Sequence, residues 1–216
     1  MPKTVKLTHV FVDFDETLFD HLSYIAWLEE QLNRIGKLPK GLGSFSRSLD
    51  DYHQVISEIP LLRLYRHAEH MQDVSEQSWE LISGEIEKLA KKQNKDFCYG
   101  DAHEFLAWLA KQGLDTRILT YGDGEYQRFK LMTCRYLRQN HLPVHVTSQA
   151  KRDFLRHNFA KVRGTLIDDK YPLDLPDGWS HIWIDRSEPL SHPINLEPGV
   201  TKISTLNQAR VILTTD

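Results

Sequence analysis

The chain has 216 residues, of which 40% are hydrophobic and 26% are charged, and its formal net charge is −3. This composition is ordinary for a globular protein, and the length suffices for one α/β domain with a small accessory domain. The slightly acidic balance argues against a general nucleic-acid binder, which would carry a basic surface.

The sequence also bears on the compartment and the partners of the protein. No apolar run approaches the ~20 residues that a membrane span needs, and Met1-Pro2-Lys3-Thr4 shows no signal-peptide pattern. The two cysteines, Cys98 and Cys134, have neither metal-ligand spacing nor the density of a disulfide scaffold. We therefore expect a cytoplasmic, reduced protein with no nucleic-acid or membrane partner.

The first predicted strand ends in two acids. The residues from Val5 to Phe14 are rich in β-branched and aromatic side chains and predict a buried strand. Asp13 and Asp15 lie at its C-terminal end, and Thr17 follows. Carboxylates are costly there unless a cation or hydrogen-bond donors satisfy them, and open α/β sheets bind ligands at this end of their strands. Alternatively, the two acids are loop residues that cap a following helix.

Residues 20–95 predict helices with little strand signal. One apolar stripe at helical spacing, which ends at Gly36, consists of Leu22, Ile25, Leu28, Leu32 and Ile35. Further helices are expected at residues 49–58, 61–72 and 75–92. A segment of this size suffices for a separate helical domain, which we expect to act as a lid over the strand end that carries Asp13.

From Gly100 onward, helices and strands alternate. We expect helices at residues 102–112, 125–139, 151–160 and 206–213, and strands at residues 116–120, 144–147, 164–168 and 181–185. This alternation is typical of a parallel sheet with crossover helices. The sequence therefore predicts a doubly wound, Rossmann-like α/β core of residues 1–19 and 96–216, with residues 20–95 as a small helical cap domain.

Three further sites with chemical potential fall at predicted strand ends. Thr120 could offer its hydroxyl to a phosphate, although an ordinary strand-to-turn threonine is the alternative. Lys151 opens a helix, where the helix dipole disfavours a cation, so its presence indicates an anionic partner unless it is a plain surface lysine. Asp168 and Asp169 end an apolar strand, and two adjacent acids at that position indicate a bound cation.

In order and spacing, these sites resemble motifs I to IV of the haloacid dehalogenase (HAD) superfamily. Motif I matches Asp-x-Asp-x-Thr-Leu at residues 13–18, motif II matches Thr120, and motif III matches Lys151. Motif IV matches the acidic pair at residues 168–169, with Asp174 as the following acid. The helical segment lies between motifs I and II, where one class of the superfamily carries its cap.

The resemblance has departures. Tyr121 stands where many members have asparagine, and Arg152 stands where many have proline. Lys130 is the rival to Lys151 for motif III, but it falls in the middle of a predicted helix and before the third core strand.

The resemblance implies a role for each matched residue. Asp13 would be the nucleophile that forms an aspartyl-phosphate, and Asp15 would be the general acid and base. Thr120 and Lys151 would hold the phosphoryl oxygens and neutralise charge during transfer.

The same residues predict a metal. Asp13, Asp15, Asp168 and Asp169 would crowd negative charge into one crevice, and Mg²⁺ is the expected counter-ion because it prefers oxygen ligands and bridges to phosphate. The ligands would be a carboxylate oxygen of Asp13, the backbone carbonyl of Asp15 and the carboxylate of Asp169. Asp168 would support these ligands without binding the metal directly.

The resemblance predicts an Mg²⁺-dependent phosphatase that acts on a small phosphorylated molecule. Cleavage of a carbon–halogen bond needs no proton for its leaving group, and the dehalogenases of the superfamily lack the second acid of motif I, so Asp15 favours phosphoryl transfer. A phosphomutase would use the same residues, and a catalytically idle interaction module is the third possibility. Arg63, Arg66 and His67 could bind a second anionic group, but we favour solvated surface for each. The sequence indicates neither the substrate nor the oligomeric state.

Overall fold

The computed structural model describes residues 7–34, 84, 87–122, 124–171 and 173–215. The chain divides into two compact units. The first, which we call the core unit, consists of residues 1–19, 98–121 and 140–216, and the second, the helical unit, consists of residues 20–97 and 122–139. The predicted boundaries of core and cap stay a prediction, and the expected helices at residues 49–58 and 61–72 lie outside the described residues.

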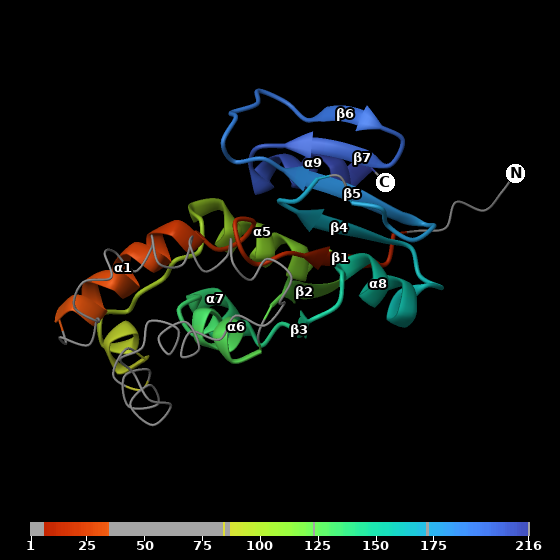
Figure 1. Ribbon diagram of the computed structural model, residues 1–216. Coiled ribbons are helices and arrows are strands. Elements are labelled where there is room, and N and C mark those ends of the chain that lie inside the picture. The colour runs from red at the N-terminus through yellow and green to blue at the C-terminus, as the bar shows by residue number, and fades with distance from the viewer. Residues whose placement is uncertain (1–6, 35–83, 85–86, 123, 172, 216) are drawn as a thin grey trace, which may run out of the picture. The chain divides into compact units, whose positions relative to one another are not determined.

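The core unit contains a seven-stranded sheet of order β3-β2-β1-β4-β5-β7-β6 (Figure 1). Its strands are β1 (His9–Val12), β2 (Asp115–Tyr121), β3 (Val144–Thr147), β4 (Gly164–Asp168), β5 (Trp179–Ile184), β6 (Ile194–Glu197) and β7 (Val200–Ile203). Every strand pair is parallel except β6–β7. This confirms the predicted α/β fold with a doubly wound sheet.

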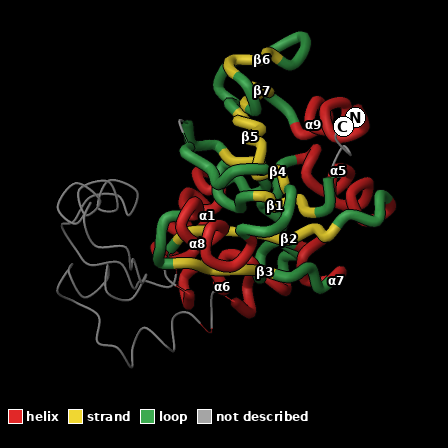
Figure 2. Tube along the Cα trace, turned by 90° about the vertical axis from the view of Figure 1, so that its right-hand side faces the viewer, coloured by secondary structure: helices red, strands yellow, loops and turns green. Residues whose placement is uncertain are grey.

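The central strands are buried because helices cover both faces of the sheet. Figure 2 shows α8 (Lys151–Phe159) on one side and α5 (Gly100–Lys111) and α9 (Leu206–Thr215) on the other. Because alternate residues of a strand point to opposite faces, the burial of all five residues of β4 means that both of its faces are covered. On the α8 side, the packed side chains are Phe11, Leu119, Leu155, Leu166 and Trp179.

Gly164 permits a close approach in this cluster. A Cβ atom built on Gly164 would lie 2.6 Å from the ring of Trp179, a distance that carbon atoms do not tolerate. The Trp179 indole N–H donates to the carbonyl of Phe159, at the end of α8, over 3.4 Å. The start of β4 therefore needs a glycine so that Trp179 can fill the space beside it.

The hairpin of β6 and β7 was not predicted. All four residues of β6 are exposed, and three of the four residues of β7 are only partly buried. Without a buried apolar run, these short segments lack the pattern by which a strand is recognised from sequence.

The helical unit contains α1 (His21–Arg34), α6 (Gly124–Leu131) and α7 (Arg135–Asn140), and residues 87–92 are also helical. The predicted stripe of α1 was wrong at Leu22, whose side chain is 75% exposed. Leu28 of that stripe is buried as predicted, and among the α1 side chains that the structure describes the other buried ones are Tyr24, Trp27 and Gln31. The Trp27 indole donates to the side-chain oxygen of Gln93 over 3.1 Å, so this face of α1 packs through aromatic and amide groups that an aliphatic stripe does not reveal.

The single helix expected at residues 125–139 is broken into α6 and α7. The Thr133 hydroxyl donates to the carbonyl of Lys130 over 2.7 Å, and the Thr133 amide donates to the same oxygen over 2.8 Å. A threonine that bonds its own backbone in this way competes with the helical hydrogen-bond pattern. None of the helices within the described ranges combines the length and the apolar character of a membrane span.

Candidate active site

The register of the sheet brings the predicted acids to one edge. Val12, the last residue of β1, pairs with Ile118 of β2 and with Ile167 of β4. The Asp13 amide donates to the carbonyl of Ile167 over 2.8 Å, so Asp13 leaves the sheet directly beside Asp168. Because the strands are parallel, both side chains emerge at the carboxyl ends, where α/β proteins bind their ligands.

Lys151 lies between the two buried carboxylates. Its Nζ atom is 2.5 Å from Oδ1 of Asp13 and 2.6 Å from Oδ2 of Asp168. The lysine comes from the first turn of α8, which starts just beyond β3 at the same edge of the sheet. The rival residue, Lys130, lies in α6 of the helical unit.

One ammonium group is thus shared by two carboxylates that are almost wholly buried. Burial raises the pKa of Asp13 well above its ordinary value, and Lys151 opposes that shift. Burial also disfavours the charged form of Lys151, but the attraction of Asp13 and Asp168 outweighs it and raises the pKa of Lys151. The lysine is therefore charged, and the Asp13 carboxyl group needs further positive charge to stay fully ionised.

Asp169 adds a third carboxylate to this group. One ligand oxygen each from Asp13, Asp168 and Asp169 lie within 4.8 Å of one another. Three carboxylate oxygens at this spacing match the hard-oxygen donor set that Mg²⁺ prefers. The residues present therefore fit the predicted metal. Asp15, at the start of the turn that follows β1, is partly buried and close enough to Asp13 for its charge to raise the pKa of Asp13.

The threonines of motifs I and II have unused donors. Thr120 is 1% exposed and lies two residues beyond the β2 residue that pairs with Val12. Its hydroxyl and that of Thr17 are buried and make no hydrogen bond within the part of the chain that the structure describes. Since buried hydroxyl groups are normally bonded, these two point to a ligand or solvent partner.

Asp174, the expected last acid of motif IV, is not part of this group. It is 73% exposed and accepts a hydrogen bond from Nη1 of Arg152 over 3.0 Å. Arg63, Arg66 and His67 lie outside the described residues.

Two residues that sequence reasoning missed hold the loop after β4. The Lys170 amide donates to Oδ1 of Asp168 over 2.8 Å, and the Trp183 indole N–H donates to the backbone carbonyl of Asp169 over 3.1 Å. The Lys170 side chain also pairs with Asp169 over 2.8 Å. Lys170 adjoins the motif and could have been considered, whereas the contact of Trp183 depends on the pairing of β4 with β5.

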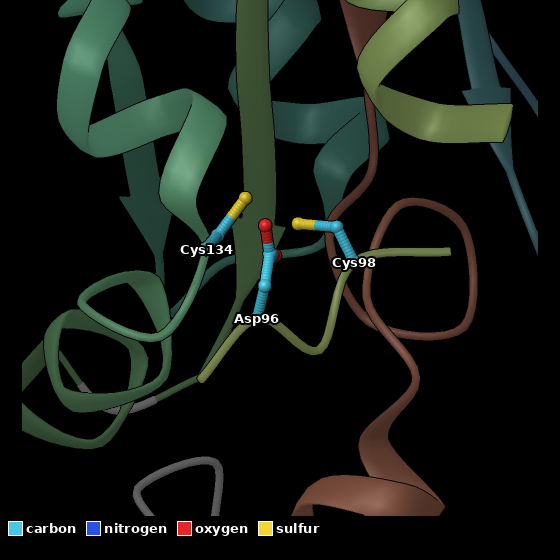
Figure 3. Close-up of side chains that lie close together, drawn as sticks. All are labelled: Asp96, Cys98 and Cys134. Carbon is cyan, nitrogen blue, oxygen red and sulfur yellow. The ribbon is translucent and has the colours of Figure 1, made fainter. Parts of the chain in front are cut away.

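Figure 3 draws three further side chains, those of Asp96, Cys98 and Cys134. Cys98 belongs to the core unit, while Asp96 and Cys134 belong to the helical unit. We assign no role to this group.

Comparison with known proteins bears on the fold. No protein-family model matches the chain, and no curated protein matches it. Among solved structures, it is similar to YfnB from Bacillus subtilis, a HAD-hydrolase bound to magnesium (TM-score 0.55, 15% identity, 96% of this chain and 99% of the other). It is also similar to a predicted phosphoglycolate phosphatase from Haemophilus somnus (0.51, 14%, 99% and 100%) and to a 2-haloacid dehalogenase from Pseudomonas syringae (0.50, 17%, 97% and 99%). The chain therefore shares the fold of these structures, which is the fold that the resemblance implies.

Proposed function

We propose that the protein is an Mg²⁺-dependent phosphatase that hydrolyses a small phosphomonoester through an aspartyl-phosphate on Asp13. The observation that carries this proposal is the Lys151 ammonium shared between Asp13 and Asp168, with Asp169 beside them. A buried nucleophilic carboxylate, a fixed cation and a further acidic group are the parts that phosphoryl transfer needs.

The proposed first step is attack by a carboxylate oxygen of Asp13 on phosphorus. Asp13 can present that oxygen because its other contacts are fixed: its amide bonds the carbonyl of Ile167 and Lys151 holds Oδ1. Asp15 gives a proton to the departing alkoxide. The hydroxyl of Thr120 and the ammonium of Lys151 donate to the phosphoryl oxygens as their charge redistributes.

In the second step, a water molecule attacks the phosphorus of the aspartyl-phosphate, and Asp15 takes its proton as general base. Asp13 is thereby regenerated and inorganic phosphate leaves. Mg²⁺ held by Asp13, Asp169 and the backbone carbonyl of Asp15, with Asp168 in support, would neutralise the negative charge of the bound phosphoryl group.

Asp15 favours phosphoryl transfer over dehalogenation, although the similar structures include a dehalogenase. A halide leaves without a proton, whereas an alkoxide is strongly basic and needs one. A second acid two residues after the nucleophile therefore has a use in ester hydrolysis and none in the release of halide.

The test is release of inorganic phosphate from a panel of phosphorylated metabolites by the purified protein with Mg²⁺. Asp13→Asn should abolish release while the melting temperature shows a folded protein, because the amide is nearly isosteric but is not a nucleophile. Asp174→Asn is the matched control and should keep the activity, since Asp174 is exposed and paired with Arg152. Formation of a phosphate isomer in place of free phosphate would instead identify a phosphomutase. Turnover by Asp13→Asn at the wild-type rate would refute the mechanism.

A further inference from the structure

The loop that carries the nucleophile is held by an arginine from a distant part of the chain. We call residues 13–19 the nucleophile loop. Arg186, two residues after β5, donates from Nη2 to the backbone carbonyl of Thr17 over 2.6 Å, across a sequence separation of 169 residues. The side chain of Arg186 is only 18% exposed, so this contact is shielded from solvent.

Arg186 is itself fixed by an acid. Nη2 and Nη1 of Arg186 donate to the two carboxylate oxygens of Asp101 over 3.0 and 3.3 Å. Asp101 lies in the first turn of α5 and also accepts the amide of Leu206, the first residue of α9, over 2.8 Å. A two-point arginine–carboxylate contact restricts orientation as well as distance. The guanidinium group is therefore tied to the starts of two helices.

Tyr99 contacts both Arg186 and the nucleophile loop. The guanidinium carbon of Arg186 lies 3.8 Å from the centre of the Tyr99 ring, within the range of a cation–π contact. The Tyr99 hydroxyl donates to a carboxylate oxygen of Glu16 over 2.7 Å, and its amide donates to the carbonyl of Leu18 over 2.9 Å. Arg186 and Tyr99 thus contact three successive residues of the nucleophile loop.

The loop needs such support because one of its residues has an unfavourable backbone. Glu16 has a φ of +56°, in the left-handed region. For a residue with a Cβ atom, this conformation costs about 1–2 kcal/mol relative to the right-handed region. The contact of its carboxylate with Tyr99 and the contact of the Thr17 carbonyl with Arg186 lie on either side of the peptide bond that follows this residue.

We propose that Arg186 is a positioning residue: together with Tyr99 and Asp101, it holds the nucleophile loop in the conformation that aligns Asp13 and Asp15. Its kinetic consequence rests on the proposed function, whereas its effect on the loop does not. The physical reason is that a displacement of about 1 Å in reacting groups can cost on the order of 100-fold in rate.

The experiment compares Arg186→Gln and Arg186→Lys with Arg117→Gln. Arg117 is a matched control because it also makes a two-point contact with an acid, Asp115, and also lies over an aromatic ring, that of Phe159. It does so within β2, where Asp115 pairs with His9 and Arg117 pairs with Phe11 of β1, so this contact lies before the nucleophile loop along the strands. Any loss that follows only from removing an arginine–aspartate pair should therefore appear in both glutamine variants.

Two readouts separate positioning from general stability. Hydrogen exchange should be faster at the loop amides of Glu16, Leu18 and Phe19 in Arg186→Gln, while the amides of β2 stay protected. With Mg²⁺ and p-nitrophenyl phosphate, kcat should fall by roughly 10–100-fold with little change in KM. Arg186→Lys should recover part of kcat, because an ammonium group can reach Thr17 or Asp101 but cannot make the two-point contact of the guanidinium group. Arg117→Gln should leave kcat and loop exchange as in the wild type.

The outcomes are distinguishable. If Arg186→Gln does not fold, Tyr99→Phe removes only the hydroxyl that holds Glu16, and faster loop exchange in that variant is the supporting result. A wild-type protein that releases no phosphate would remove the proposed function and leave the exchange measurement as the test. Unchanged loop exchange in Arg186→Gln, or an equal fall of kcat in Arg117→Gln, would overturn the proposal.

Discussion

Replacing Lys151 should destabilise the protein more than replacing an ordinary surface lysine does. Its ammonium contacts both Asp13 and Asp168, whose side chains are 6% and 1% exposed. Lys151→Met has similar length and leaves these carboxylates buried without that cation. Breaking a buried ion pair costs about 3–5 kcal/mol, which for a chain of this size corresponds to roughly 6–20 °C in melting temperature.

The loss should depend on pH in a direction that follows from the site. Without Lys151, the pKa of Asp13 should rise further above its ordinary value, because burial then acts without the opposing ammonium. An acid whose folded pKa is raised loses stability as pH increases from its unfolded pKa up to its folded pKa. The pKa of Asp13 is already raised in the wild type, so the variant should lose up to about 1.4 kcal/mol per pH unit relative to the wild type only between the folded pKa of Asp13 in the wild type and that in the variant.

Thermal unfolding in a chelator, at about pH 5 and about pH 8, measures both effects. Lys170→Met is the control, since Lys170 is 73% exposed and its pair with Asp169 should be worth less than about 1 kcal/mol. Mg²⁺ should recover more of the melting temperature in Lys151→Met than in the wild type, because it supplies the missing positive charge. A Lys151→Met protein that melts like Lys170→Met at both pH values would refute this account of the site.

The remaining predictions concern proton transfer, the metal and the core. In Asp15→Asn, the rate of the first chemical step should fall ~10²–10⁴-fold with alkyl phosphates but much less with p-nitrophenyl phosphate. Rapid-mixing kinetics should show a burst of product because the aspartyl-phosphate accumulates. Equal losses of rate with both esters and no burst would show that Asp15 carries no proton. Mg²⁺ should raise the melting temperature of the wild type, and the rise should shrink in Asp169→Asn; calorimetric titration of Mg²⁺ checks this, and an equal affinity in the two proteins would exclude Asp169 as a ligand. Gly164→Ala should lower the stability by about 1–3 kcal/mol because its Cβ atom would lie 2.6 Å from Trp179, and denaturant unfolding with Gly84→Ala, where the added atom meets nothing within 4 Å, is the comparison.

The sequence by itself determined the α/β class and the order of the chemistry along the chain. The strand Gly164–Asp168 is buried on both faces, so its apolar residues Leu166 and Ile167 are adjacent and do not alternate with exposed polar ones, which a local pattern reveals. Acids at the ends of two such strands, at Asp13 and Asp168, were predicted to meet because parallel strands share one carboxyl edge, and the register places them side by side. The sequence suffices for these features because the apolar pattern of a strand indicates both that the strand is buried and at which edge of a parallel sheet it ends.

Only the tertiary structure decided the contacts between residues that no strand or helix pattern places together. It placed Lys151 between two carboxylates, and it paired Asp174 with Arg152 in spite of the acidic pattern that grouped Asp174 with motif IV. It also brought Arg186 to the Thr17 carbonyl across 169 residues. A side chain that bonds a backbone carbonyl can do so at any sequence position, because every residue offers the same oxygen. Such contacts leave no mark on the sequence of the accepting residue, and only the packing of the strands and helices around them selects the partner.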